Sequence, residues 1–203
     1  MQKIGVTGII GSGKSTVGKL LQESGYPVLD ADKAVHQLYE TSSLLKQKLV
    51  DTFGESILES NAISRKNLAS IVFQNQTALK QLENIVYPYL KQVIIDFFKT
   101  CEQNKQEFAF LEAALLHKIP EILESLDKIW FISAQENVLL ERLVKRGLSF
   151  DDAKNRLNLQ KKNPSLESSE FLTVCKKKSS WIEVIENDKT LDVLKEKIST
   201  LLK

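Results

Sequence analysis

The stretch GIIGSGKST, residues 8–16, constrains this chain more than any other part of its sequence. It fits the spacing G-x-x-x-x-G-K-[ST] and follows an apolar segment, residues 3–6, that predicts a buried strand. The residues KSTVGKLLQES have the apolar spacing of a helix. A glycine-rich turn between a strand and a helix lets backbone N–H groups surround a phosphate at the positive end of the helix. The sequence therefore predicts a loop that binds a nucleoside triphosphate.

This loop also supplies the side chains that phosphate transfer needs. Lys14 can reach the β- and γ-phosphates, and the Ser15 hydroxyl can ligate Mg²⁺. We therefore expect ATP as a substrate, Mg²⁺ as a cofactor and a catalytic role for Lys14. The residues expected to bind ATP are Gly11, Ser12, Gly13, Lys14, Ser15 and Thr16.

Composition and charge exclude several classes of protein. A chain of 203 residues that is 42% hydrophobic can bury the core of one domain. Its net charge of +2 is too small to suggest nucleic acid as a partner. No apolar run could span a bilayer, and the N-terminus lacks the apolar stretch of a signal peptide, so we expect a cytoplasmic protein without a membrane partner.

These exclusions favour an enzyme that phosphorylates a small molecule. A motor ATPase would need a longer chain, and no NKxD-like motif for guanine recognition is present. Two other readings remain open: a nucleoside monophosphate or deoxynucleoside kinase, and a non-catalytic module that senses ATP. The expected state is a monomer or a weak homo-oligomer.

Short strand signals that alternate with helices predict an α/β fold. We expect the three-layer P-loop kinase fold, with a five-stranded parallel sheet. A long helical stretch, residues 77–102, contains Pro88, which should kink or split it. A single domain, 1–203, is expected, with its core at residues 1–31, 105–145 and 179–203 and two helical insertions at residues 32–104 and 146–178.

Two aspartates follow the second predicted strand in the sequence VLDAD, residues 28–32. Ligands of doubly wound sheets bind at the carboxyl ends of the strands, so we expect this strand end beside the phosphate loop. Either Asp30 or Asp32 could accept the proton of an acceptor hydroxyl. Alternatively, Asp30 caps the helix that begins near Ala31 and Asp32 only favours its N-terminus. The residues alone leave these roles open.

Arginines gather in one part of the sequence. Only four of the 28 basic residues are arginines, and three of these lie within residues 142–156. Arg142 and Arg146 are four residues apart and share one face of a predicted helix. Because the arginine fork matches phosphate oxygens, we expect Arg142 to bind ATP and Arg146 to neutralise charge during transfer. The alternative is that they are solvated charges on a helix face.

Motifs along essentially the whole chain follow the order seen in one enzyme family. They are TGIIGSGKST, VLDAD, FG at 53–54, R..L...VF at 65–73, LE.I..P at 82–88, ERLVKRGLS, A..R...Q at 153–160 and VIEND. Together they resemble the dephospho-CoA kinase family. That family transfers the γ-phosphate of ATP to the ribose 3′-hydroxyl of dephospho-CoA, the last step of coenzyme A synthesis.

The resemblance implies roles for particular residues. Asp32 resembles the general base, and residues 32–104 resemble the region that binds the acceptor, through Asp32, Arg65 and Tyr87. Residues 146–178 resemble the lid that closes over ATP.

The chain also departs from the family pattern. Glu112 stands where the family has aspartate, and Tyr87 stands where it usually has histidine. Because Glu112 keeps a carboxylate, we expect it to hold Mg²⁺ through a water molecule.

Overall fold

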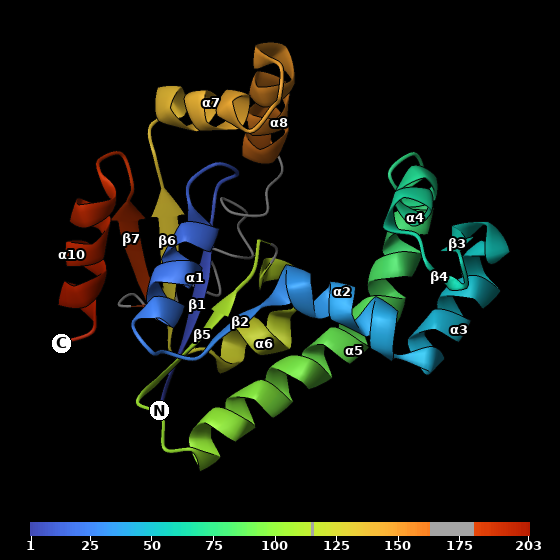
Figure 1. The fold of residues 1–203 in the computed structure, drawn as a ribbon, viewed down its shortest axis with the longest axis horizontal. Coiled ribbons are helices and arrows are strands. Elements are labelled where there is room, and N and C mark those ends of the chain that lie inside the picture. Colours follow the sequence, from blue (N-terminus) through green and yellow to red (C-terminus); the bar gives the residue numbers. More distant parts are fainter. Residues whose placement is uncertain (115, 163–180) are drawn as a thin grey trace. The chain divides into compact units, whose positions relative to one another are not determined.

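A computed structural model describes residues 1–114, 116–162 and 181–203. Five parallel strands form one sheet in the order β2-β5-β1-β6-β7 (Figure 1). These strands are β1 (Gln2–Gly8), β2 (Val28–Asp30), β5 (Phe108–Glu112), β6 (Lys128–Ser133) and β7 (Ile182–Glu186). The predicted α/β P-loop kinase fold with a five-stranded parallel sheet is confirmed.

The chain divides into two compact units, each described by itself. We call them the core unit (Met1–Leu29 and Thr100–Lys203) and the helical unit (Asp30–Lys99). The helices of the core unit are α1 (Lys14–Glu23), α6 (Pro120–Ser125), α7 (Glu136–Lys145), α8 (Phe150–Lys162) and α10 (Leu191–Leu201). The helices that begin in the helical unit are α2 (Ala31–Thr41), α3 (Ser43–Phe53), α4 (Arg65–Val72) and α5 (Gln76–Gln103).

Side chains of β1 alternate between two helical layers. Ile4 and Val6 are buried in a cluster with apolar residues of α1 and α10. Gly5 points to the opposite face, where a Cβ would lie 2.7 Å from Leu126 Cδ1 and 2.9 Å from Leu116 Cδ1. Alternation with a period of two thus buries both faces of the strand, as a sheet between two helical layers requires.

The strand order corrects one expectation. We expected the end of the second strand to lie beside the phosphate loop, but β5 lies between β1 and β2. In the parallel ladder of β1 and β5, Val6 is paired with Glu112, the last residue of β5. The strand-end carboxylate next to β1 is therefore Glu112, not Asp30 or Asp32.

The helical unit has its own apolar core, whose fully buried members include Leu45, Leu49, Ile57, Leu68 and Val86. A small hairpin joins this core, formed by β3 (Leu58–Glu59) and β4 (Ala62–Ile63). Helix α5 continues unbroken from Gln76 to Gln103 with Pro88 inside it, so the expected split does not occur.

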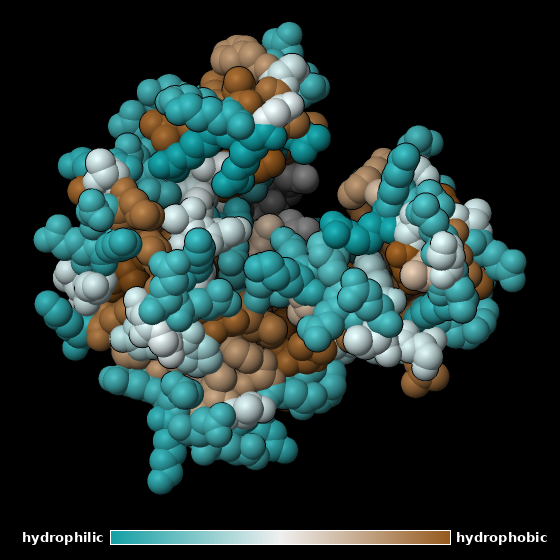
Figure 2. Space-filling view, in the orientation of Figure 1, coloured by the Kyte–Doolittle hydropathy of each residue, from teal (hydrophilic) through white to brown (hydrophobic). Residues whose placement is uncertain are grey.

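Hydrophilic side chains cover most of the face of the molecule that Figure 2 shows. None of the helices in the described ranges combines the length and apolar character needed to cross a membrane.

Candidate active site

The phosphate loop connects β1 to α1, and its carbonyl oxygens accept hydrogen bonds from Lys14. Lys14 Nζ donates hydrogen bonds to the carbonyl oxygens of Gly8 (2.8 Å) and Ile9 (3.2 Å). Gly13, the N-cap of α1, has φ 98°, a left-handed conformation that favours glycine. The lysine ammonium group is thus held at the loop, where the N-terminus of α1 adds its positive end.

A hydroxyl and a carboxylate meet at the first turn of α1. Ser15 Oγ donates a hydrogen bond to Glu112 Oε1 at 2.8 Å, and Glu112 is only 8% exposed. Because the Ser15 hydroxyl proton points toward Glu112, the lone pairs of the Ser15 oxygen can face a cation. Hard oxygen donors of this kind suit Mg²⁺, which in nucleotide sites takes only one or two protein ligands beside phosphates and water. Ser15 and Glu112 therefore fit the predicted metal site.

In the described part of the chain, this pair is not part of a larger cluster of metal-binding side chains. Within residues 1–114, 116–162 and 181–203, no three His, Cys, Asp or Glu side chains gather so that they could hold a metal ion. A site that depends on nucleotide phosphates for most of its ligands needs no such cluster.

A basic pocket of about 350 Å³ opens beside the phosphate loop. It brings together five residues predicted to act on ATP: Gly11, Gly13, Thr16, Arg142 and Arg146. It also contains residues to which the sequence analysis gave no role: Lys145, Asn187, Lys189, Leu191 and Leu194. Its four positively charged side chains could bind the phosphates of a nucleotide, and its two leucines could pack against the base.

Asn187 connects the phosphate loop to Arg142. Its side-chain Nδ2 donates to the Ser12 carbonyl oxygen at 2.7 Å, and its own carbonyl accepts from Arg142 Nη2 at 2.8 Å. A Cβ on Gly13 would lie 2.4 Å from Asn187 Nδ2, so glycine is also required there for close approach. Arg142 is half-buried and hydrogen-bonded to these partners, so the interpretation of Arg142 as a solvated charge on a helix face is wrong. Arg146, in contrast, is exposed at the C-cap of α7.

Helix α8, the described part of the predicted lid, contacts the phosphate loop. Ala153 and Leu157 of α8 are buried in a cluster that includes Ile9 and Ile10. Gln160 Oε1 accepts a hydrogen bond from the Ile10 backbone N–H at 2.8 Å. The rest of the predicted lid, residues 163–178, lies outside the described residues, as do residues 179–180 of the predicted core.

The two aspartates at the start of α2 have different surroundings. Asp30 is the N-cap: its Oδ1 accepts from the Lys33 backbone N–H at 3.0 Å, and its Oδ2 lies 3.0 Å from Lys33 Nζ. The interpretation of Asp30 as a helix cap is confirmed. Asp32 is exposed in the first turn of the same helix.

Arg65 and Tyr87, both predicted to bind the acceptor, interact with the same residue of the helical unit, Tyr39. Burial raises the pKa of Tyr39, and the nearby positive charge of Arg65 opposes this rise. Burial also raises the pKa of Tyr87, aided by the carboxylate of Glu83, to which the Tyr87 hydroxyl donates a hydrogen bond, and by Tyr39. Asp32 and Tyr39 are seven residues apart on α2, so they share a helix face.

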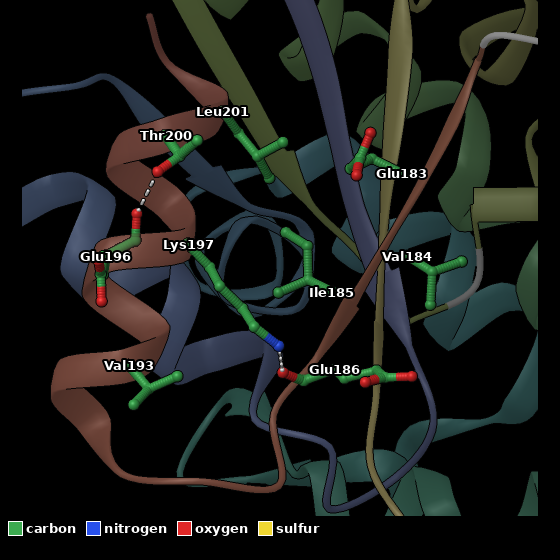
Figure 3. A pocket seen from close by; sticks show the side chains of 9 residues that line it. All are labelled: Glu183, Val184, Ile185, Glu186, Val193, Glu196, Lys197, Thr200 and Leu201. Carbon is green, nitrogen blue, oxygen red and sulfur yellow. Dashed lines mark hydrogen bonds between the residues drawn. The ribbon is translucent and has the colours of Figure 1, made fainter.

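A second hollow of the core unit, about 500 Å³, lies between β7 and α10 (Figure 3). Three of its lining residues are Glu183, Glu186 and Glu196, and the Lys197 ammonium donates to the Glu186 carbonyl oxygen at 2.8 Å. An acidic lining of this kind repels phosphates, so the basic pocket is the better ATP site.

Comparisons with known proteins match this chain to one enzyme family. A family model described as dephospho-CoA kinase matches residues 2–172. A dephospho-CoA kinase from Aquifex aeolicus is 38% identical over 161 residues, 79% of this chain and 81% of the relative. A crystal structure from Thermus thermophilus is 30% identical with a TM-score of 0.73, and the match covers 99% of this chain and 96% of that one. A Campylobacter jejuni dephospho-CoA kinase structure is 25% identical with a TM-score of 0.66, covering 100% and 96%.

The family match spans most of the chain and includes the phosphate loop, Glu112 and both arginines of the basic pocket. The chain therefore belongs to the dephospho-CoA kinase family.

Proposed function

We propose that this chain transfers the γ-phosphate of ATP to the ribose 3′-hydroxyl of dephospho-CoA, giving coenzyme A and ADP. The observation that carries the proposal is the phosphate loop of a family member, in which Lys14 is hydrogen-bonded to the loop carbonyls and Ser15 to Glu112. The family favours this acceptor over the nucleosides and nucleoside monophosphates that the motifs alone left open.

ATP enters the basic pocket with its phosphates against the backbone N–H groups of residues 11–16. Lys14 leaves the loop carbonyls and binds the β- and γ-phosphates, which is what a P-loop lysine can do. Arg142 keeps the loop and Asn187 in place. Arg146 is exposed on the pocket wall and neutralises charge that develops on the transferred group.

The Ser15–Glu112 pair prepares the metal side of the same site. Ser15 Oγ would hold a Mg²⁺ ion directly and Glu112 would hold it through water, and the ion would supply positive charge to the phosphates. Glu112 fixes the direction of the Ser15 hydroxyl proton, so the oxygen lone pairs are oriented before nucleotide binds.

The acceptor is bound by the helical unit. Asp32, whose carboxylate is exposed, takes the proton of the 3′-hydroxyl as the oxygen attacks phosphorus. The α2 face continues for about 10 Å from Asp32 to Tyr39, at 1.5 Å per residue. Arg65 and Tyr87 near Tyr39 contact a part of the acceptor remote from the reacting hydroxyl.

An acceptor assay tests this function. ADP formation should be rapid with dephospho-CoA and slow with nucleosides, nucleoside monophosphates or no acceptor, and mass spectrometry should place the new phosphate on the 3′-oxygen. Lys14→Ala should lower turnover by ~10²–10³-fold, the cost of losing one group that acts on developing charge.

Lys19→Ala, which removes an exposed lysine from the same helix, is the matched control and should keep its activity. Preference for a nucleoside monophosphate would contradict the proposed acceptor. ATP binding without transfer to any acceptor would instead indicate a sensor.

A further inference from the structure

Gly18 lies in the middle of α1, where glycine is unfavourable. It is less suited to a helix interior than alanine because it loses more backbone entropy on folding. Its φ is not among the positive values of this chain, so no unusual backbone conformation requires glycine there. Another reason must exist for the missing side chain.

That reason is the position of Glu112. A Cβ on Gly18 would lie 2.5 Å from Glu112 Oε2 and 3.5 Å from Glu112 Cδ. The next atom, Val28 Cγ1, is 3.8 Å away, an ordinary contact. The space that an alanine methyl group would need at residue 18 is therefore filled by one carboxylate oxygen.

The two oxygens of Glu112 contact two positions of one helix face. Oε1 accepts from Ser15 Oγ, and Oε2 lies over Gly18, three residues further along α1. A glutamate at the end of β5 reaches one methylene further than an aspartate at the same place would. The extra length carries the carboxylate across onto α1, where any side chain at residue 18 would obstruct it.

We propose that Gly18 is a positioning residue for Glu112, and that the pair is coupled: the absent side chain at residue 18 accommodates the extra methylene at residue 112. The role of the pair in the reaction rests on the proposed function, because it assumes that Glu112 acts at the metal side of ATP. The steric coupling depends only on the geometry.

Thermal unfolding of the nucleotide-free and metal-free protein tests the coupling. In the parent chain, Gly18→Ala should lower Tm, because the Cβ displaces a buried carboxylate from its hydrogen bond with Ser15. In the Glu112→Asp background the shorter side chain leaves room, and the same substitution should raise Tm by ~2–4 °C through its better helix propensity. The change of sign is the expected result.

Two further variants make this result specific. Lys19→Ala changes the next residue of α1, whose side chain is 75% exposed, and should shift Tm equally in both backgrounds. Glu112→Gln keeps the length of glutamate, so Gly18→Ala should remain destabilising in that background. An equal Tm shift for Gly18→Ala in the parent chain and in the Glu112→Asp background would overturn the coupling.

Binding of Mn²⁺, followed by electron paramagnetic resonance with saturating ADP, tests the positioning role. Gly18→Ala should weaken Mn²⁺ binding by ~10-fold, in the range found when a group that orients a metal ligand is disturbed. Adding Glu112→Asp to Gly18→Ala should restore most of the Mn²⁺ affinity. A general structural defect caused by Gly18→Ala would not be rescued in this way. Unchanged Mn²⁺ binding in Gly18→Ala would overturn the role. Neither measurement involves an acceptor, so a wrong acceptor assignment would be visible separately.

Discussion

Asp30 and Asp32 are two residues apart at the start of α2, but their carboxylates have different surroundings. Asp30 accepts the Lys33 backbone N–H and pairs with the Lys33 side chain, whereas Asp32 is exposed. We therefore predict that Asp32→Asn lowers the turnover number by ~10²–10⁴-fold, because an amide cannot take the proton of the acceptor hydroxyl. Single-turnover rates at saturating ATP and dephospho-CoA measure the effect, and ATP affinity should be retained.

Asp30→Asn is the matched control, since it removes the same charge but keeps a good N-cap residue. It should retain most of the activity, while Asp30→Ala should lose about 1 kcal/mol of unfolding free energy with the cap. If Asp30→Asn lost the chemical step and Asp32→Asn kept it, the two roles would be reversed.

Residues of a motif could be predicted because their chemistry follows from local spacing. Lys14 and Ser15 have fixed places relative to the loop glycines, whereas Glu112 was indicated by the resemblance to the family pattern. Asn187 lies in the VIEND motif, but local spacing gave it no role. Its bond to Ser12 joins residues 175 positions apart, so its role depends on tertiary packing. The available signals were its place in the VIEND motif and its place just after β7, where ligand-binding residues gather in such sheets.

Helix α8 contacts the phosphate loop through apolar side chains and through a hydrogen bond. The Ile10 N–H of the loop donates to Gln160, near the end of α8. We predict that Gln160→Ala speeds hydrogen exchange of the Ile10 amide, because this amide loses its acceptor. Exchange should be measured without nucleotide.

Gln160→Glu keeps an acceptor and should retain protection of the Ile10 amide. Asn158→Ala, at an exposed position of the same helix, is the matched control. If exchange of the Ile10 amide were the same in Gln160→Ala as in the parent chain, other contacts would protect it and Gln160 would not link the lid helix to the loop.

Long elements with regular apolar spacing were predicted more easily than short or interrupted ones. Pro88 predicted a kink or a split in the long helix, but one lost hydrogen bond does not break α5, whose neighbouring residues Val86 and Leu90 are buried. The β3–β4 hairpin has two residues in each strand, too few to show a period. Its turn residues Ser60 and Asn61 both have positive φ, the conformation of a tight hairpin turn.

At the scale of the whole molecule, the residues proposed to bind ATP and those proposed to bind the acceptor belong to different units. The phosphate loop, the Ser15–Glu112 pair and the basic pocket belong to the core unit, whereas Asp32, Arg65 and Tyr87 belong to the helical unit. Each unit has an apolar core of its own, so each can hold its binding residues in place. The strand order of the core unit could not be read from chain order, because β1 pairs with β5 and β6 and not with the strand that follows it. Sheet pairing across a hundred residues leaves little mark on local sequence.

This separation predicts that the two substrates protect different parts of the chain from hydrogen exchange. ADP should slow exchange in residues 8–16 and 187–191, since these segments line the basic pocket. Coenzyme A, the product, should slow exchange around Asp32, Tyr39, Arg65 and Tyr87 when added without nucleotide. Lys14→Ala should reduce the first effect and leave the second unchanged, because Lys14 belongs to the core unit. Protection of the core unit alone by coenzyme A would show that the helical unit does not bind the acceptor, even if the reaction itself proceeds as proposed.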